Sequence, residues 1–249
     1  MSLGTWQMRG RAASRGVQMA VEAGYRCIDT ATGYDNEAAV GAGIRASGID
    51  RDDVLVITKF PEEAAGHERE TLLRSLDLLG VEYLDLWLIH APLDADGSLA
   101  IWERFAEARE DGLVRAIGVS NFLPDQVDDL VARSGVVPAV NQIAFGPRFF
   151  TPALAPHHAG LGIVTQGHSP FSENDLEHPV LRATAERHGR SVQQILLRWH
   201  LEHGVPVVVK SVSPAHLTAN LTATDFSLAP DAIAAIDRIG SATWGRTAP

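Results

Sequence analysis

The stretch Val54-Leu55-Val56-Ile57-Thr58-Lys59 gives the clearest indication of the fold. Its aliphatic and β-branched residues do not alternate strictly with polar ones, which is typical of a strand that is covered on both faces. Runs of the same kind cover residues 25–29 and 84–90, and they end in Asp29 and His90 as this one ends in Lys59. We therefore expect parallel strands whose C-terminal ends carry ionisable side chains.

Helical patterns separate such runs along the whole chain. The expected strands cover residues 4–7, 27–29, 54–59, 84–90, 116–120, 139–143, 162–165 and 207–210. The expected helices lie near residues 12–22, 36–47, 69–79, 101–110, 124–131, 152–159, 192–201 and 216–221, with two extra helices at 180–187 and 231–239. Eight strands that are each followed by a helix predict a (β/α)8 TIM barrel, an α/β fold, formed by residues 1–249 as a single domain.

The composition is that of an ordinary soluble globular protein, with 45% hydrophobic and 21% charged residues. The formal net charge of −10 argues against nucleic acid and anionic membranes as main partners. The single cysteine, Cys27, excludes an internal disulfide and fits a reducing compartment. Because the chain shows no secretory signal pattern and no apolar run of about 20 residues, we expect a cytoplasmic protein.

Four residues form a candidate proton-transfer site at one rim of this barrel. Asp29, Lys59 and His90 end successive strand-like runs, and Tyr34 follows Asp29 in the loop that leads to the next helix. A lysine after an apolar strand needs an anionic partner, which Asp29 can supply. We expect the Lys59 ammonium to lower the pKa of Tyr34, and His90 to orient a carbonyl group or assist the proton. Each residue alone has an ordinary structural explanation, but the set together indicates a site.

Two motifs suggest other chemistry. Residues 41–46 match the pattern G-x-G-x-x-A of dinucleotide-binding folds, but these glycines fall inside an expected helix, so we interpret them as a site of close helix packing. Residues 167–171 resemble the start of a nucleophile elbow, although Pro170 and Phe171 follow the serine and no closing glycine is present. A hydrolase that uses Ser169 is therefore a weakly supported alternative.

The histidine pairs of the chain do not predict a metal site. The pair His157 and His158 and the pair His200 and His203 lack a nearby carboxylate or thiolate with convincing ligand spacing. We interpret these histidines as surface or packing residues.

The motifs of the chain, taken in order, resemble those of the aldo-keto reductase family, in particular bacterial members similar to 2,5-diketogluconate reductase. They are Gly4-Thr5-Trp6, Gly24-Tyr25-Arg26-Cys27-Ile28-Asp29-Thr30-Ala31, Tyr34-Asp35-Asn36-Glu37, Thr58-Lys59, Asp85-Leu86 with His90, Ile117-Gly118-Val119-Ser120-Asn121-Phe122, Val140-Asn141-Gln142 and Lys210-Ser211. The resemblance implies reduction of a small-molecule aldehyde or ketone by NADP(H), bound at the barrel mouth without a Rossmann domain. It also implies that Tyr34 is the general acid, that Lys59 with Asp29 lowers its pKa, and that His90 positions the carbonyl.

The resemblance further implies a set of binding residues. The positions expected to contact the cofactor are Gly4, Thr5, Ser120, Asn121, Gln142, His168, Ser169, Lys210, Ser211, His216 and Asn220. Within this set, Ser120, Asn121 and Gln142 match positions that bind the nicotinamide carboxamide. Lys210 and Ser211 match positions near the adenosine phosphate. The positions expected in the substrate pocket are Trp6, Phe60 and Trp87.

The chain departs from the family pattern at several points. His216 stands where an arginine usually faces the 2′-phosphate, so we expect a weakened preference for NADPH and keep NAD(H) as an alternative. His168 stands where many relatives stack an aromatic ring on the nicotinamide. The N-terminal hairpin that closes the base of the family's barrel is absent from the sequence, and the loop after His90 is short, so we expect an open mouth and a broad substrate range. We expect a monomer, and keep a non-catalytic, redox-sensing cofactor-binding protein as the alternative function.

Overall fold

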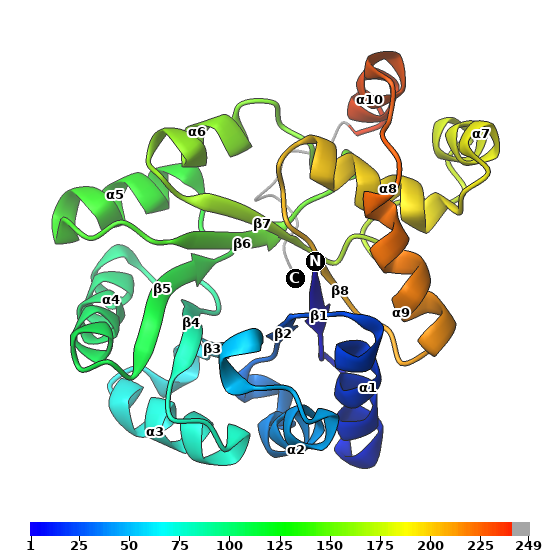
Figure 1. Ribbon diagram of the computed structural model, residues 1–249. Coiled ribbons are helices and arrows are strands. Elements are labelled where there is room, and N and C mark those ends of the chain that lie inside the picture. The colour runs from blue at the N-terminus through cyan, green and yellow to red at the C-terminus, as the bar shows by residue number, and fades with distance from the viewer. Residues whose placement is uncertain (241–249) are drawn as a thin grey trace.

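The computed structural model describes residues 1–240, which form a ring of eight parallel strands enclosed by helices (Figure 1). The strands are β1 (Ser2–Gly4), β2 (Cys27–Asp29), β3 (Leu55–Phe60), β4 (Leu84–Ile89), β5 (Val114–Ser120), β6 (Val140–Ala144), β7 (Val164–His168) and β8 (Val208–Val209). The helices are α1 (Gly10–Ala23), α2 (Glu37–Ser47), α3 (Glu68–Leu79), α4 (Ala95–Glu110), α5 (Pro124–Ser134), α6 (Leu154–Gly160), α7 (Pro179–His188), α8 (Val192–Glu202), α9 (Pro214–Leu221) and α10 (Pro230–Asp237). The predicted (β/α)8 barrel is confirmed, and residues 241–249 of the predicted domain lie outside the described range.

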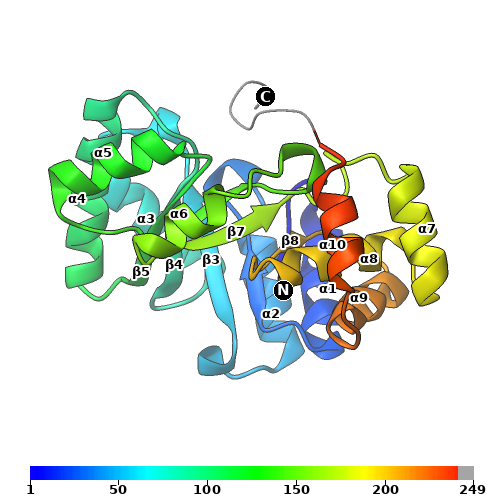
Figure 2. The same ribbon diagram turned by 90° about the horizontal axis from the view of Figure 1, so that it is seen from above.

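The sheet closes on itself to form the barrel. Its strand order is β7-β6-β5-β4-β3-β2-β1-β8, and a parallel bridge between Gly167 and Val207 joins its two edge strands. Figure 2 shows the helices distributed along both sides of the strands, with α7 and α10 at one end and α4 and α5 at the other. Because all strands run in parallel, their C-terminal ends meet at one rim.

Several predicted boundaries differ from the observed ones. β1 ends at Gly4 because a backbone bond from Met8 N to Thr5 O turns the chain, with Gln7 at a φ of 61°. β7 covers Val164–His168 rather than 162–165, so its C-terminal end lies three residues further along the chain than we expected. α4 begins at Ala95 rather than near residue 101, because the Asp94 side chain accepts a hydrogen bond from Gly97 N and caps the helix.

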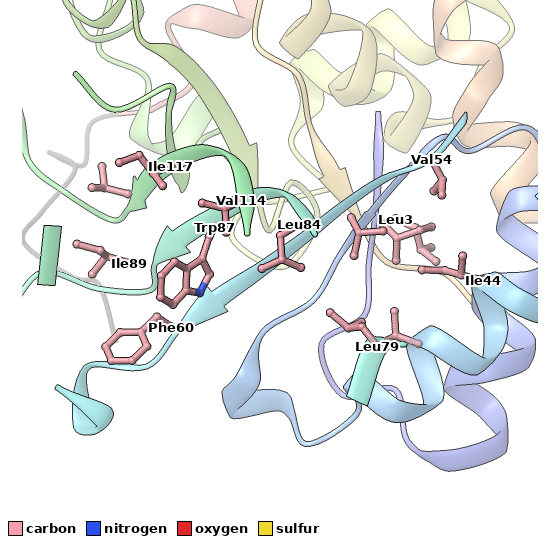
Figure 3. Packing of buried hydrophobic residues seen from close by; sticks show 14 of the residues in the cluster. Leu3, Ile44, Val54, Phe60, Leu79, Leu84, Trp87, Ile89, Val114 and Ile117 are labelled. Carbon is pink, nitrogen blue, oxygen red and sulfur yellow. The ribbon is translucent and has the colours of Figure 1, made fainter. Parts of the chain in front are cut away.

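The main hydrophobic core lies between the strands and the surrounding helices (Figure 3). Side chains alternate along each strand, so one set points outward into this core and the other points into the barrel lumen. Trp87 belongs to the outward set and stacks on Phe105 with ring centroids 3.6 Å apart, and Phe60 meets both rings edge-on. This aromatic group packs α4 against β3 and β4.

The glycines of α2 confirm the interpretation of close helix packing. A Cβ atom added at Gly41 would lie 2.0 Å from the backbone oxygen of Leu79, and one added at Gly43 would lie 2.4 Å from that of Ser14. Only glycine allows α2 to approach both α1 and α3 so closely. The motif therefore serves packing and is not a phosphate-binding loop.

The described residues also bear on the membrane and metal expectations. None of the helices within residues 1–240 combines the length and the apolar character needed to cross a membrane. Within the same residues, no group of three or more His, Cys, Asp or Glu side chains is arranged to hold a metal ion.

Candidate active site

The C-terminal rim of the barrel gathers the polar residues predicted from the sequence. Asp29 ends β2, Lys59 lies near the end of β3, and His90 directly follows β4. Tyr34 enters from the short 3-10 turn that follows β2. Asp29 and Lys59 are buried, whereas Tyr34 and His90 are partly exposed, so their rings can be reached from the rim.

Lys59 and Asp29 form a buried ion pair at the centre of the site. The Lys59 ammonium donates to Asp29 Oδ1 and also to the backbone oxygen of Thr30 at 3.0 Å. Burial alone would lower the pKa of Lys59, but Asp29 and Tyr34, through charge and hydrogen bonding, together raise it. Lys59 is therefore a cation at neutral pH and the charge of Asp29 is compensated.

The phenol of Tyr34 lies between this ammonium and the imidazole of His90. Lys59 Nζ is 5.4 Å from the Tyr34 ring centroid, and the rings of Tyr34 and His90 meet edge-on at 5.8 Å. Burial raises the pKa of Tyr34, and the positive charge of Lys59 lowers it by a smaller amount. The predicted lowering of the Tyr34 pKa by Lys59 is present, but burial outweighs it, and the sequence does not reveal how deeply Tyr34 is buried.

His90 is uncharged at neutral pH. Burial, followed by repulsion from the Lys59 ammonium, lowers the pKa of His90 to about 4. A neutral imidazole carries one N–H donor, which is the form required to hold a carbonyl oxygen by a hydrogen bond.

At this rim the side chain of Asn121, which follows β5, reaches His168 at the end of β7, past the intervening strand β6. The Asn121 side chain donates to the backbone oxygen of His90 at 3.2 Å, and its Oδ1 lies 3.0 Å from Nε2 of His168. Because that oxygen only accepts, His168 carries its proton on Nε2, and Nδ1 accepts from the Ser169 hydroxyl at 3.0 Å. Asn121 and Ser169 both have left-handed backbones, with φ of 62° and 55°. The imidazole of His168 is thus held in one orientation.

The contact between Ser169 and His168 has the outline of a nucleophile and its base. Burial, then the charge of Lys59 and the nearby His90, lowers the pKa of His168 to about 4. Such a weakly basic imidazole is poorly matched to removing a proton from a serine hydroxyl near pH 7. The low pKa of His168 therefore argues against the hydrolase alternative, and the hydrogen bond from Ser169 instead helps to fix the His168 ring.

A chain of buried polar groups crosses the barrel lumen beneath the ion pair. The amide nitrogen of Gln142 donates to Asp29 Oδ2 and to Gln166 Oε1, both at 2.7 Å. With both N–H groups engaged, the remaining polar atom of Gln142 is its oxygen, which is an acceptor. Sequence reasoning missed Gln166, although it lies two residues before His168 on β7 and therefore faces the same side.

Lys210 and His216, which were predicted near the phosphates of the adenosine, are exposed, and Trp6, which was predicted in the substrate pocket, lies beside Lys210. Trp6 is 54% exposed, and Lys210 Nζ lies 5.6 Å from its ring centroid and donates to Gln7 Oε1 at 2.9 Å. The Ser211 hydroxyl accepts from Ser213 N at the start of α9, and His216 is exposed in the first turn of that helix.

Other predicted cofactor positions hold the strands and helices together. Thr5 is buried and donates its hydroxyl to the backbone oxygen of Asp29 at 3.1 Å. Gly4 permits close approach to β8, since an added Cβ would lie 2.8 Å from a side-chain carbon of Val208. Ser120 donates to the backbone oxygen of Gln142 at 2.9 Å, next to Asn121. Asn220 is buried in α9.

Two residues predicted to line the substrate pocket do not face the barrel lumen. Phe60 and Trp87 are fully buried in the outer hydrophobic core, as Figure 3 shows. The alternation of side chains explains this correction: Lys59 points into the lumen, so its neighbour Phe60 points away from it. Trp87 lies on the opposite face of β4 from Leu86 and Leu88, which fill the lumen.

Known proteins resemble this chain over nearly its whole length. The model of the family described as Aldo/keto reductase family matches residues 1–241. Morphine 6-dehydrogenase of Pseudomonas putida is 39% identical over 96% of this chain and 86% of its own length. An aldo-keto reductase of Mycobacterium sp. (strain JLS) is 40% identical over 98% of this chain and 90% of its own length.

Solved structures show the same architecture. An aldo/keto reductase from Brucella melitensis has a TM-score of 0.90 at 40% identity and covers 95% of this chain and 93% of its own. A Bombyx mori aldo-keto reductase in complex with NADP has a TM-score of 0.88 at 34% identity and covers 96% of this chain and 88% of its own.

Proposed function

Since this chain belongs to the aldo-keto reductase family, we propose that it is an oxidoreductase that reduces an aldehyde or ketone to an alcohol with NAD(P)H. The single observation that carries the proposal is the position of the Tyr34 phenol between the Lys59 ammonium and the His90 imidazole. A bound nicotinamide would supply the hydride. The residues of the chain would supply the proton and the orientation.

Tyr34 is the general acid in this proposal. Reduction places negative charge on the carbonyl oxygen, so an acid that delivers a proton there lowers the barrier, typically by about 10²–10⁴-fold. The raised pKa of Tyr34 keeps the phenol protonated near pH 7, as a proton donor must be. The Lys59 ammonium then stabilises the phenolate that remains after the proton has left.

Asp29 and His90 act on either side of that step. Asp29 balances the charge of Lys59, so the lysine can remain a buried cation. His90, neutral because burial and Lys59 lower its pKa to about 4, offers one N–H to the carbonyl oxygen without competing as an acid. This division of roles assigns the proton to the phenol and the orientation of the substrate to the imidazole.

The residues beside this cluster fit a nicotinamide carboxamide. The side-chain oxygen of Gln142 on β6 can accept from the carboxamide nitrogen, and the Ser120 hydroxyl and the Asn121 amide lie at the end of the neighbouring strand β5. His168, held by Asn121 and Ser169, presents an imidazole face that can stack on the ring.

The adenosine end would be held more loosely. Lys210 and Ser211 can donate hydrogen bonds to a phosphate of the cofactor. His216 is exposed and lacks the permanent charge and the paired donors of an arginine. We therefore propose NADP(H) as the cofactor, with a weak preference over NAD(H).

The proposal is tested by following cofactor absorbance at neutral pH with a panel of small aldehydes, ketones and diketones. Morphine, assayed in the direction of oxidation, belongs in the panel because a relative is named for that activity. Turnover of carbonyl compounds supports the proposal. Tight NADPH binding without turnover of any compound would instead favour the non-catalytic, redox-sensing alternative.

A further inference from the structure

Tyr34 is the member of the four-residue cluster whose position depends on a loop. Asp29, Lys59 and His90 lie at strand ends, where the ladder of the sheet fixes their backbone. Tyr34 lies in a single 3-10 turn, Thr32–Tyr34, and the next residue, Asp35, has a left-handed backbone with a φ of 52°. Something outside this turn must hold the phenol at its distance from Lys59.

Asn36 fixes one side of the loop. Its side chain is buried, accepts from the Thr30 hydroxyl at 2.7 Å, and donates to the backbone oxygens of Thr5 at 2.8 Å and Met8 at 3.1 Å. The amide thereby joins the Tyr34 loop to the segments that follow β1 and β2.

Glu37 fixes the other side. Its side chain is only 2% exposed, and its two oxygens accept from the hydroxyls of Thr58 at 2.6 Å and Ser75 at 3.1 Å. Thr58 directly precedes Lys59 on β3. The hydrogen bond between Thr58 and Glu37 therefore connects the segment that carries Tyr34 to the strand that carries Lys59. A buried carboxyl is costly unless its oxygens are paired, and both are paired here.

A simple helix-capping role does not explain these residues. Asn and Glu are frequent at helix N-termini because they satisfy or complement the free N–H groups there. Asn36 makes no side-chain bond to its own helix, and the bonds of Glu37 lead to β3 and α3. The polar atoms of both residues therefore form hydrogen bonds to other segments: those of Asn36 to the residues after β1 and β2, and those of Glu37 to β3 and α3.

We propose that Glu37, acting through Thr58, is a positioning residue that sets the Tyr34 hydroxyl against the Lys59 ammonium. The role rests on the proposed function but concerns residues that do not touch substrate or cofactor. Asn36 supports it by holding the opposite side of the same loop. Loosening the Glu37–Thr58 link lets the phenol move away from the cation, and displacements near 1 Å can cost about 10²-fold in rate.

The first test is Thr58→Val, which removes the hydroxyl but keeps the shape of the side chain. We expect kcat to fall on the order of 10-fold while the Kd of NADPH, measured by tryptophan fluorescence, changes less than about twofold. Glu37→Gln keeps an oxygen for Thr58 and a donor for Ser75, so its kcat should fall less than that of Thr58→Val. Thr184→Val, a buried threonine bonded to a helix carbonyl in α7, is the matched control and should leave both quantities unchanged.

The second test does not need turnover. Tyrosine labelled with ¹³C at Cζ gives separate signals for the chain's three tyrosines, and Tyr34→Phe assigns the relevant one. We expect the pKa of Tyr34 to rise by about half a unit in Thr58→Val, because the phenolate loses part of its stabilisation by Lys59. Thr184→Val should leave that pKa where it is in wild type, and Glu37→Gln should raise it less than Thr58→Val does.

These outcomes separate the two proposals. If wild type reduces no carbonyl compound, the proposed function fails, while the titration still decides the positioning role. An unchanged Tyr34 pKa and an unchanged kcat in Thr58→Val would overturn the positioning role. An equal loss in Thr58→Val and Thr184→Val would also overturn it, since the loss would then not depend on the link between Thr58 and Glu37.

Discussion

Lys59 and Lys210 are the two lysines of the chain, and each follows an apolar run at the same rim of the barrel. Their surroundings are opposite. Lys59 is 1% exposed and paired with Asp29, whereas Lys210 is exposed and bonded to the neutral side chain of Gln7. The same sequence pattern thus places a lysine at the rim in both cases, while the neighbouring segments decide whether it is buried in an ion pair or exposed to solvent.

The buried lysine should carry the larger effect. Lys59→Met removes the charge that stabilises the phenolate, so we expect kcat to fall by about 10²–10³-fold. It also leaves the buried Asp29 carboxylate without its counter-ion, which should lower the free energy of unfolding by about 3–5 kcal/mol. Steady-state kinetics and urea unfolding measure the two losses. A Lys59→Met protein with wild-type kcat would show that the buried lysine does not support the proton transfer.

The exposed lysine should affect binding instead of chemistry. We expect Lys210→Met to raise the Kd of NADPH by about tenfold, because a charged hydrogen bond to phosphate is lost, while kcat at saturating cofactor changes little. Fluorescence titration at low and high salt checks the result, since the loss should shrink as salt screens the charge. A fall in kcat with unchanged affinity would reverse the roles given to the two lysines.

His216, which is also exposed, stands where the family usually has an arginine, and this difference can be reversed by substitution. His216→Arg should increase the ratio of NADH to NADPH dissociation constants by up to about fivefold, the range of an exposed ion pair. The two constants are compared in wild type and variant under one buffer. If the ratio does not change, the assignment of His216 to the 2′-phosphate is wrong.

The titration of His90 near Lys59 should make the free energy of unfolding depend slightly on pH. The pKa of His90 is lowered to about 4 in the folded chain, against about 6.5 when unfolded, so the unfolded state binds more protons between these values. The contribution of His90 to stability is therefore present above pH 6.5 and is lost as the pH falls toward 4. Urea midpoints at pH 7.5 and 4.5 should differ less in His90→Gln than in wild type. An identical difference in both would show that His90 does not titrate in this way.

The features that were predicted correctly depend on local sequence. The apolar runs before Asp29, Lys59 and His90 are long enough to specify strands, and their parallel arrangement brings their ends to one rim. Phe60 could also have been placed correctly, because it must face away from Lys59 on the same strand. Residues that are adjacent along a strand face opposite sides of the sheet, so a neighbour of a site residue in the sequence does not itself face the site.

The features that were missed depend on distant contacts. The bond between His168 and Asn121 joins two strand ends through left-handed backbones that no short pattern specifies. The raised pKa of Tyr34 depends on burial, which emerges only when the loops are packed. Glu37 belongs to the motif that begins with Tyr34, but its contact with Thr58 depends on the packing of α2 against β3, which the sequence does not specify locally.

The most direct test of the account is the rate of Tyr34→Phe with NADPH and a carbonyl compound that wild type reduces. Phenylalanine keeps the ring beside His90 and removes only the hydroxyl. We expect a loss in kcat of about 10²–10⁴-fold with the Kd of NADPH unchanged. A Tyr34→Phe protein that turns over at the wild-type rate would contradict it.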